Sequence, residues 1–138
     1  NVEFKPLQPW EDVPKILAMA DVHLVVQKRG AADAVLPSKL TNILSAGGHA
    51  LVTAEKHTEL GKIADRHRGI YELVEPEDTG AFIQCLERCL AKDTSRPNGV
   101  ARSYACEYLN KDKIIDRFVA DLQELVDSKV DKVVTNEC

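Results

Sequence analysis

The chain has 138 residues, of which 44% are hydrophobic and 29% are charged, and this composition is typical of one soluble globular domain. Its 18 basic and 22 acidic side chains give a formal net charge of −4, which argues against nucleic acid as a partner because that function needs a basic surface. No apolar run approaches the roughly 20 residues of a transmembrane segment, and no signal peptide opens the chain.

The first part of the chain predicts a strand, a helix and a second strand. Residues 2–5 form the first short strand, which Pro6 ends. Asp12 is a candidate N-cap for a helix over residues 13–20, where apolar side chains recur at helical spacing. Residues 23–27 are nearly continuous in apolar character, as expected of a buried parallel strand.

The middle of the chain continues the alternation of strands and helices. A long loop over residues 28–36 leads into a helix over residues 38–46, which Gly47 and Gly48 end. Residues 50–53 form the next strand.

The last part predicts one more strand and several helices. A short helix over residues 58–67 precedes a strand over residues 70–74. Residues 76–78 then lead into a helix with Phe82, Ile83, Leu86 and Leu90 on one side. Two further helices follow over residues 100–109 and 113–126, and residues 127–138 are expected to be a loose tail.

Strands that alternate with helices predict an α/β fold, a Rossmann-like parallel sheet with helices on both faces, followed by C-terminal helices. Four strands are few for such a sheet, no glycine-rich strand-to-helix turn lies at its front, and the first residue is Asn1 rather than Met. We therefore expect a part of a longer protein in which the first βα unit lies upstream. The predicted division is a partial domain over residues 1–126 and a tail over residues 127–138.

The four cysteines are expected to be reduced thiols of a cytoplasmic protein. Cys85 and Cys89 are four residues apart in a helical stretch, a spacing that is awkward for a disulfide. We find no metal-ligand cluster, no Ser/His/Asp arrangement and no Walker A loop, so no metal cofactor is predicted.

In an open parallel sheet, ligands bind beyond the carboxyl ends of the strands. The long loop over residues 28–36 ends there on a helix N-terminus, where free amides and the helix dipole favour an anion. Ser38 adds a hydroxyl and Lys39 a positive charge, which makes this a candidate diphosphate site. The alternative is that Ser38 only caps the helix and Lys39 is solvated.

Asn42 lies one helical turn after Ser38 on a polar stripe, within reach of a ribose, although an ordinary polar flank explains it as well. Glu55, Thr58 and Glu59 follow the next strand and are weaker candidates. Glu59 could equally be a first-turn carboxylate that complements a helix dipole. Trp10 could pack beside a base, with a core or staple role as the alternative, and a structural role is favoured for His49.

Three segments closely resemble colanic-acid-type bacterial glycosyltransferases, which are retaining enzymes of the GT-B group, glycosyltransferase family four. They are residues 35–44 (VLPSKLTNIL), 47–55 (GGHALVTAE) and 58–61 (TELG). The flanking residues 1–4 and 13–22 and the 75–78 turn fit more weakly, so the resemblance covers most of residues 1–125.

The resemblance implies the C-terminal, donor-binding half of a GT-B fold, with its first βα unit missing. Ser38 and Lys39 would bind the donor diphosphate, Asn42 the ribose, and the backbone near Leu7 and Gln8 the base. The loop that holds Gly30 and Asp33 would lie near the donor sugar. Many relatives carry two glutamates eight positions apart, but Ala34 and Asn42 stand there in this chain, so the paired-glutamate role is not carried over.

The parent would then transfer a sugar from a nucleotide-diphosphate donor, most simply UDP-linked, to a lipid-linked or polysaccharide acceptor in exopolysaccharide synthesis. The acceptor and the catalytic groups would lie in a missing N-terminal domain, and that domain would also make any peripheral contact with the inner membrane. Two other functions stay open: a phosphoacceptor signalling domain of flavodoxin-like topology, and a non-catalytic sugar-binding or interaction module.

Overall fold

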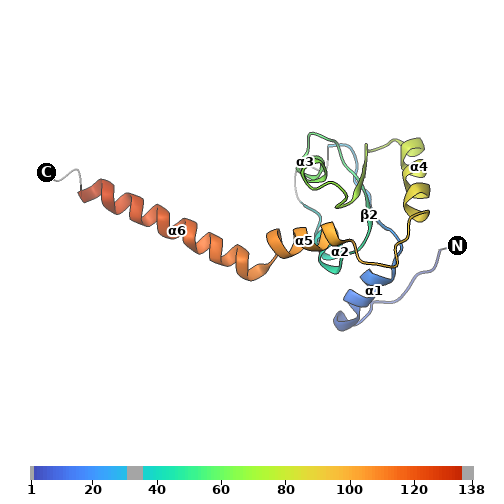
Figure 1. The fold of residues 1–138 in the computed structure, drawn as a ribbon, viewed down its shortest axis with the longest axis horizontal. Coiled ribbons are helices and arrows are strands. Elements are labelled where there is room, and N and C mark those ends of the chain that lie inside the picture. Colours follow the sequence, from blue (N-terminus) through green and yellow to red (C-terminus); the bar gives the residue numbers. More distant parts are fainter. Residues whose placement is uncertain (1, 31–35, 135–138) are drawn as a thin grey trace.

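A three-stranded parallel sheet forms the centre of the fold (Figure 1). The computed structural model describes residues 2–30 and 36–134. Strands β1 (His23–Val25), β2 (Ala50–Thr53) and β3 (Glu72–Val74) are ordered β1-β2-β3. Leu24 lies opposite Leu51, and Val52 lies opposite Leu73. β2 is central and buried along its whole length, which is why its sequence is continuously apolar up to Thr53.

The predicted first strand over residues 2–5 is wrong, because these residues form no strand. Val2 is 83% exposed and Phe4 is 93% exposed, so the segment stands away from the sheet. Alternating apolar residues form a strand only where a neighbouring edge supplies backbone partners. No described segment pairs with residues 2–5, and their apolar side chains consequently stay in solvent.

Helices cover both faces of the sheet, as predicted. One core joins β1 and β2 to α2 (Ser38–Ala46), α3 (Glu59–Arg66) and α5 (Gly99–Tyr108). The other core packs α4 (Thr79–Leu90) against the opposite face through Leu51, Val74, Cys85 and Cys89. The 3₁₀ turn η1 (Trp10–Asp12) and α1 (Val13–Met19) lie beside α2.

α2 is the best example of sequence determining local structure. Leu40, Ile43 and Leu44 form its apolar stripe and are almost fully buried. Gly47 ends the helix with φ +73, a left-handed conformation that suits glycine. The helix therefore begins and ends where the sequence predicts, and its first residue is Ser38 at the candidate anion site.

The predicted apolar side of α4 is partly wrong. Ile83 is 50% exposed and Leu90 is 58% exposed, while Cys85 and Cys89 face the sheet with Phe82 and Leu86. Residues 82, 85, 86 and 89 follow the helical period, and a cysteine thiol behaves as a small hydrophobic group.

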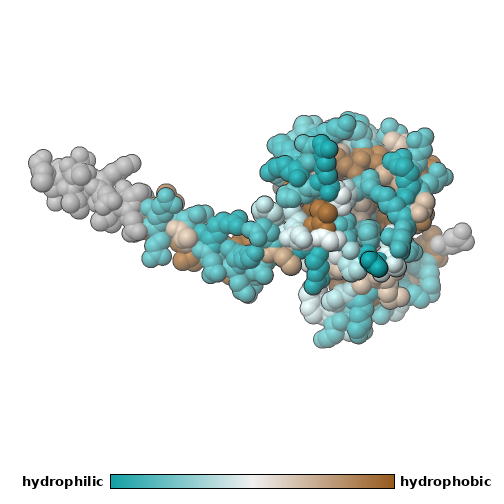
Figure 2. All heavy atoms as spheres, viewed as in Figure 1, coloured by the Kyte–Doolittle hydropathy of each residue, from teal (hydrophilic) through white to brown (hydrophobic). Residues whose placement is uncertain are grey.

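α6 (Lys111–Val134) leaves the rest of the molecule as a long arm (Figure 1). The helix continues past residue 126, so the expectation of a loose tail from residue 127 is wrong as far as residue 134. Hydrophobic atoms are visible between hydrophilic ones along the arm (Figure 2), and Ile114, Phe118 and Leu122 are 46–61% exposed. None of the helices in the described residues is long and apolar enough to cross a membrane.

Candidate functional site

The carboxyl ends of all three strands meet at one edge of the sheet. There the side chain of Thr53 extends the hydrogen bonding between β2 and the chain that follows β1. Thr53 Oγ1 accepts a hydrogen bond from the Gln27 backbone N–H at 2.7 Å and donates one to the Gln27 carbonyl at 2.9 Å. A threonine hydroxyl thus replaces a ladder partner beyond the end of β1 and fixes the start of the loop that follows.

Arg29 joins the three segments that follow the strands. Its guanidinium donates to the carbonyl of Pro76 at 3.1 Å, lies 3.6 Å from the Glu55 carboxylate and lies 3.8 Å from the Glu77 carboxylate. Sequence reasoning did not select Arg29, because its partners come from two other strand ends and depend on strand order.

Glu55 contacts the loop after β1. Its carboxylate accepts a hydrogen bond from the Gly30 N–H at 3.0 Å, and the side chain is only 13% exposed. Glu55 and Gly30, both candidate site residues, are therefore brought together. The other loop candidate, Asp33, lies outside the described residues.

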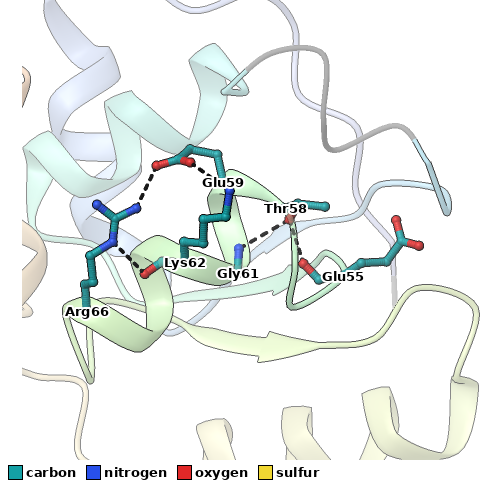
Figure 3. A network of polar contacts seen from close by, with 6 residues as sticks. All are labelled: Glu55, Thr58, Glu59, Gly61, Lys62 and Arg66. Atoms are coloured by element: carbon teal, nitrogen blue, oxygen red, sulfur yellow. Dashed lines mark hydrogen bonds and ion pairs between the residues drawn. The ribbon is translucent and has the colours of Figure 1, made fainter.

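Thr58 and Glu59 are both engaged at the start of α3 (Figure 3). Thr58 is 1% exposed and caps the helix by accepting from the Gly61 N–H, so its hydroxyl faces the protein interior. Glu59 lies in the first turn and pairs with Arg66 at 3.0 Å and Lys62 at 3.8 Å. This arrangement matches the first-turn carboxylate that the sequence offered as the alternative for Glu59.

Ser38 and Lys39 form the exposed first turn of α2. The N-cap residue is Pro37 and no side-chain cap hydrogen bond forms, so the alternative in which Ser38 only caps the helix is wrong. Lys39 is exposed, but its ammonium donates to the Leu24 carbonyl at 2.9 Å. The His23 N–H donates to the carbonyl of His49, just before β2, so the backbone groups of His23 face β2. The backbone groups of successive residues in a strand point to opposite sides. The Leu24 carbonyl therefore faces away from β2, at the open edge of β1.

A groove runs along that edge and contains Lys39. It has a volume of about 430 Å³ and is lined by Leu24, Val25, Val26, Gln27, Pro37 and Lys39. The Gln27 side-chain oxygen is buried and has no hydrogen-bond partner among the described residues. The edge therefore combines an apolar wall with a cation and an acceptor.

Asn42 lies in a different groove, between α1 and α2. This groove has a volume of about 240 Å³ and brings Asn42 together with Trp10, Ser45 and Arg102. Trp10 is 76% exposed, so the core role that the sequence allowed for it is wrong. Arg102 is a second residue that sequence reasoning missed; it reaches the groove from α5 and donates to the Ser45 carbonyl at 3.0 Å.

The base-binding candidates do not line this groove. Leu7 and Gln8 are both exposed, and the Gln8 amide donates to the Pro6 carbonyl at 2.7 Å. They precede Trp10 by two or three residues, so the same segment carries the groove's tryptophan. Their contact with a base stays a prediction.

A small cavity at the opposite end of the sheet is lined by side chains that bond to other parts of the protein. His49 bonds the Arg96 carbonyl at 3.0 Å, and Lys92 donates to Glu72 at 2.6 Å, which raises the pKa of Lys92. Burial, followed by the neighbouring Cys85 thiol, raises the pKa of Cys89 to about 11. Burial also raises the pKa of Tyr71, whose hydroxyl donates to the Leu60 carbonyl.

Metal ligands do not gather in the part of the chain that the structure describes. No group of three or more His, Cys, Asp or Glu side chains there is arranged to hold a metal ion. The strand ends offer groups for hydrogen bonding and charge, namely the backbone amides of α2, the Lys39 ammonium and the Arg29 guanidinium.

Comparison with known proteins confirms the resemblance that the sequence motifs indicate. The chain is 48% identical over 123 residues to a curated protein of Escherichia coli (strain K12) named "Putative colanic acid biosynthesis glycosyl transferase WcaI". These residues make up 89% of this chain and 30% of the relative, so the chain spans less than a third of the relative's length. No family model matches the chain, and no solved structure matches it.

Proposed function

We propose that the chain is the nucleotide-sugar-binding part of a retaining glycosyltransferase of exopolysaccharide synthesis, such as colanic acid synthesis. The observation that carries this proposal is the 48% identity over 89% of the chain, which includes the candidate diphosphate segment of α2. The parallel sheet supports it, because such sheets bind nucleotides beyond their carboxyl edge.

The diphosphate of the donor binds at the first turn of α2. The free amides and dipole of that turn favour an anion, and Ser38 and Lys39 are exposed there. A lysine ammonium has three donors, so Lys39 can keep its bond to the Leu24 carbonyl and also contact a phosphate oxygen.

The nucleoside, most simply uridine, extends from the diphosphate toward the groove between α1 and α2. Asn42 is four residues after Ser38, which corresponds to about 6 Å along the helix axis. Its amide binds the ribose hydroxyls, and the exposed ring of Trp10 is available to the base. The backbone near Leu7 and Gln8 completes the base contact.

The leaving nucleoside diphosphate is stabilised by amides, the helix dipole and cations rather than by a metal ion. The binding site for the acceptor, which is lipid-linked or a polysaccharide, lies in an N-terminal domain of the longer protein. The catalytic groups lie in that domain as well. We place the protein in the cytoplasm, with contact to the inner membrane through that domain. The 138-residue chain alone should therefore transfer no sugar to any polysaccharide precursor.

A thermal-shift screen with UDP, GDP, ADP and acetyl phosphate tests this proposal. We expect UDP to raise the melting temperature most and acetyl phosphate to leave it unchanged. Stabilisation by acetyl phosphate alone would favour a phosphoacceptor domain, although that function wants an acidic side chain where Gln27 stands. No shift with any nucleotide would favour a sugar-binding or interaction module.

A further inference from the structure

The turn between β2 and α3 is a rigid mount for Glu55. The Glu55 carbonyl accepts hydrogen bonds from the Thr58 N–H at 3.1 Å and from the Thr58 hydroxyl at 2.6 Å. The same hydroxyl accepts from the Gly61 N–H at 3.3 Å (Figure 3). One buried threonine thus ties the turn to the first turn of the helix.

Gly61 makes this mount possible because it has no side chain. A Cβ at this position would lie 2.3 Å from the Lys56 carbonyl oxygen and 2.6 Å from the Glu55 carbonyl oxygen. The backbone of the turn therefore packs directly on the helix, and Glu55 has little freedom to move.

From this mount the Glu55 carboxylate reaches away from α3 (Figure 3) and holds the loop that follows β1. One oxygen accepts from the Gly30 N–H at 3.0 Å, and the other lies 3.6 Å from the Arg29 guanidinium. Two side chains at the end of β2 thus hold residues 27–30 in place. Thr53 accepts a hydrogen bond from the Gln27 N–H, and Glu55 accepts one from the Gly30 N–H. Glu59, by contrast, is exposed and pairs only with its own helix among the ion pairs of the described residues.

We propose that Glu55 is a positioning residue, which holds the start of the loop after β1 through Gly30 and Arg29 in the conformation that the nucleotide-sugar donor needs. The proposal rests on the proposed function for its ligand, but its geometry stands on the contacts above. Glu55 itself does not touch the donor. Its carboxylate is already used by the loop, and its effect on binding passes through the backbone of Gly30.

Amide hydrogen exchange of Gly30 and calorimetry with UDP-glucose together test this inference. The variants are Glu55→Ala, which removes both contacts, and Glu55→Gln, whose amide oxygen can still accept from Gly30. Arg29→Ala removes the guanidinium alone. Glu87→Ala is the matched control, because Glu87 is an exposed glutamate of α4 about two helical turns beyond the start of that helix.

We expect Glu55→Ala to speed exchange at Gly30 about ten- to a hundredfold, the range for one hydrogen bond to a charged acceptor. Glu55→Gln should restore most of this protection, a rescue that loss of general stability would not produce. Variants with faster Gly30 exchange should bind UDP-glucose more weakly, and Glu55→Ala should bind it most weakly. Glu87→Ala should leave both the exchange rate and the affinity unchanged.

Unchanged Gly30 exchange in Glu55→Ala would overturn the inference, and so would faster exchange without any loss of UDP-glucose affinity. If the unmodified chain binds no nucleotide, the proposed function fails, and the donor part of the inference fails with it. The exchange data would still decide whether Glu55 holds the loop. Should Glu55→Ala not fold, Glu55→Asp replaces it, because the shorter side chain keeps the charge but withdraws the carboxylate from the Gly30 N–H.

Discussion

Replacing Gly61 with alanine tests whether the turn after β2 packs as closely on α3 as the structure indicates. The new Cβ would meet three backbone atoms at 2.3, 2.5 and 2.6 Å, namely the Lys56 carbonyl oxygen, the Lys56 carbonyl carbon and the Glu55 carbonyl oxygen. None of them can rotate away as a flexible side chain could, so either the turn or the helix must shift.

The cost of this shift exceeds the gain from helix propensity. Overpacking of this kind costs about 1–3 kcal/mol or more, while Gly→Ala inside a helix gains at most about 1 kcal/mol. Since all three contacts are with backbone atoms, we expect a net loss of about 2 kcal/mol. For a chain of this length, that corresponds to a fall of roughly 6–10 °C in melting temperature.

Urea unfolding followed by circular dichroism measures the loss, and Gly80→Ala supplies the matched control. Gly80 also lies in the first turn of a helix, α4, but its Cβ would meet only the Asp78 side-chain oxygen at 3.6 Å. Gly80→Ala should therefore be neutral or slightly stabilising. Equal stabilities for Gly61→Ala and the unmodified chain would refute the close packing of the turn, and with it the rigid mount of Glu55.

Three further predictions concern the binding site and the pH dependence of stability. Lys39→Ala should weaken UDP binding about ten- to a hundredfold and leave uridine binding unchanged, because the charge acts on phosphate; equal losses in calorimetry would move Lys39 away from the diphosphate. Asn42→Ala should cost at most about tenfold in UDP affinity and abolish discrimination against the 2′- and 3′-deoxy analogues, whereas one common factor for all three ligands would make Asn42 an ordinary polar flank. The free energy of unfolding should fall as the pH rises from about 9 toward 11, because the raised pKa values of Cys89 and Tyr71 mean that the unfolded chain releases these protons first, and the Lys92–Glu72 bond is lost as Lys92 deprotonates. Cys89 and Tyr71 each contribute at most about 1.4 kcal/mol per pH unit, and urea titrations that give the same free energy across this pH range would contradict the burial of the two protons.

Much of the fold follows from local sequence. The stripe of Leu40, Ile43 and Leu44 and the terminal Gly47 determine α2 almost without tertiary information. The continuous apolar run of β2 likewise predicts a central parallel strand. The residues that begin and end these two elements lie within or next to them in the sequence, and the structure confirms the predicted bounds.

Features that depend on neighbours were not predictable in the same way. Residues 2–5 have the alternation of a strand, but a strand also requires an edge to pair with, which the sequence cannot supply. The buried face of α4 was misjudged because cysteine was not counted among the apolar residues that face the sheet.

The candidate site divides along the same line. Ser38 and Lys39 could be selected as candidates from the sequence because a helix N-terminus is a local feature, and their role in binding stays a prediction. The contacts of Glu55 with Gly30 and of Arg29 with Pro76 join residues 25 and 47 positions apart, so they appear only when the strand order is known. Likewise, the pairing of Asn42 with Trp10 and Arg102 in one groove depends on how α1 and α5 pack against α2.

Titration of the ¹⁵N-labelled chain with UDP, followed by amide chemical shifts, tests the central proposal most directly. A chain that holds only part of the site should bind with a dissociation constant of about 1 mM, equivalent to roughly 4 kcal/mol, so the titration should reach about ten times that concentration. We expect saturable shifts at the amides of Ser38, Lys39 and Asn42, which α2 carries at the proposed diphosphate and ribose positions. Shifts confined to the His49 cavity at the opposite end of the sheet, or no saturable shift at all, would contradict the assignment of the first turn of α2 as the nucleotide site.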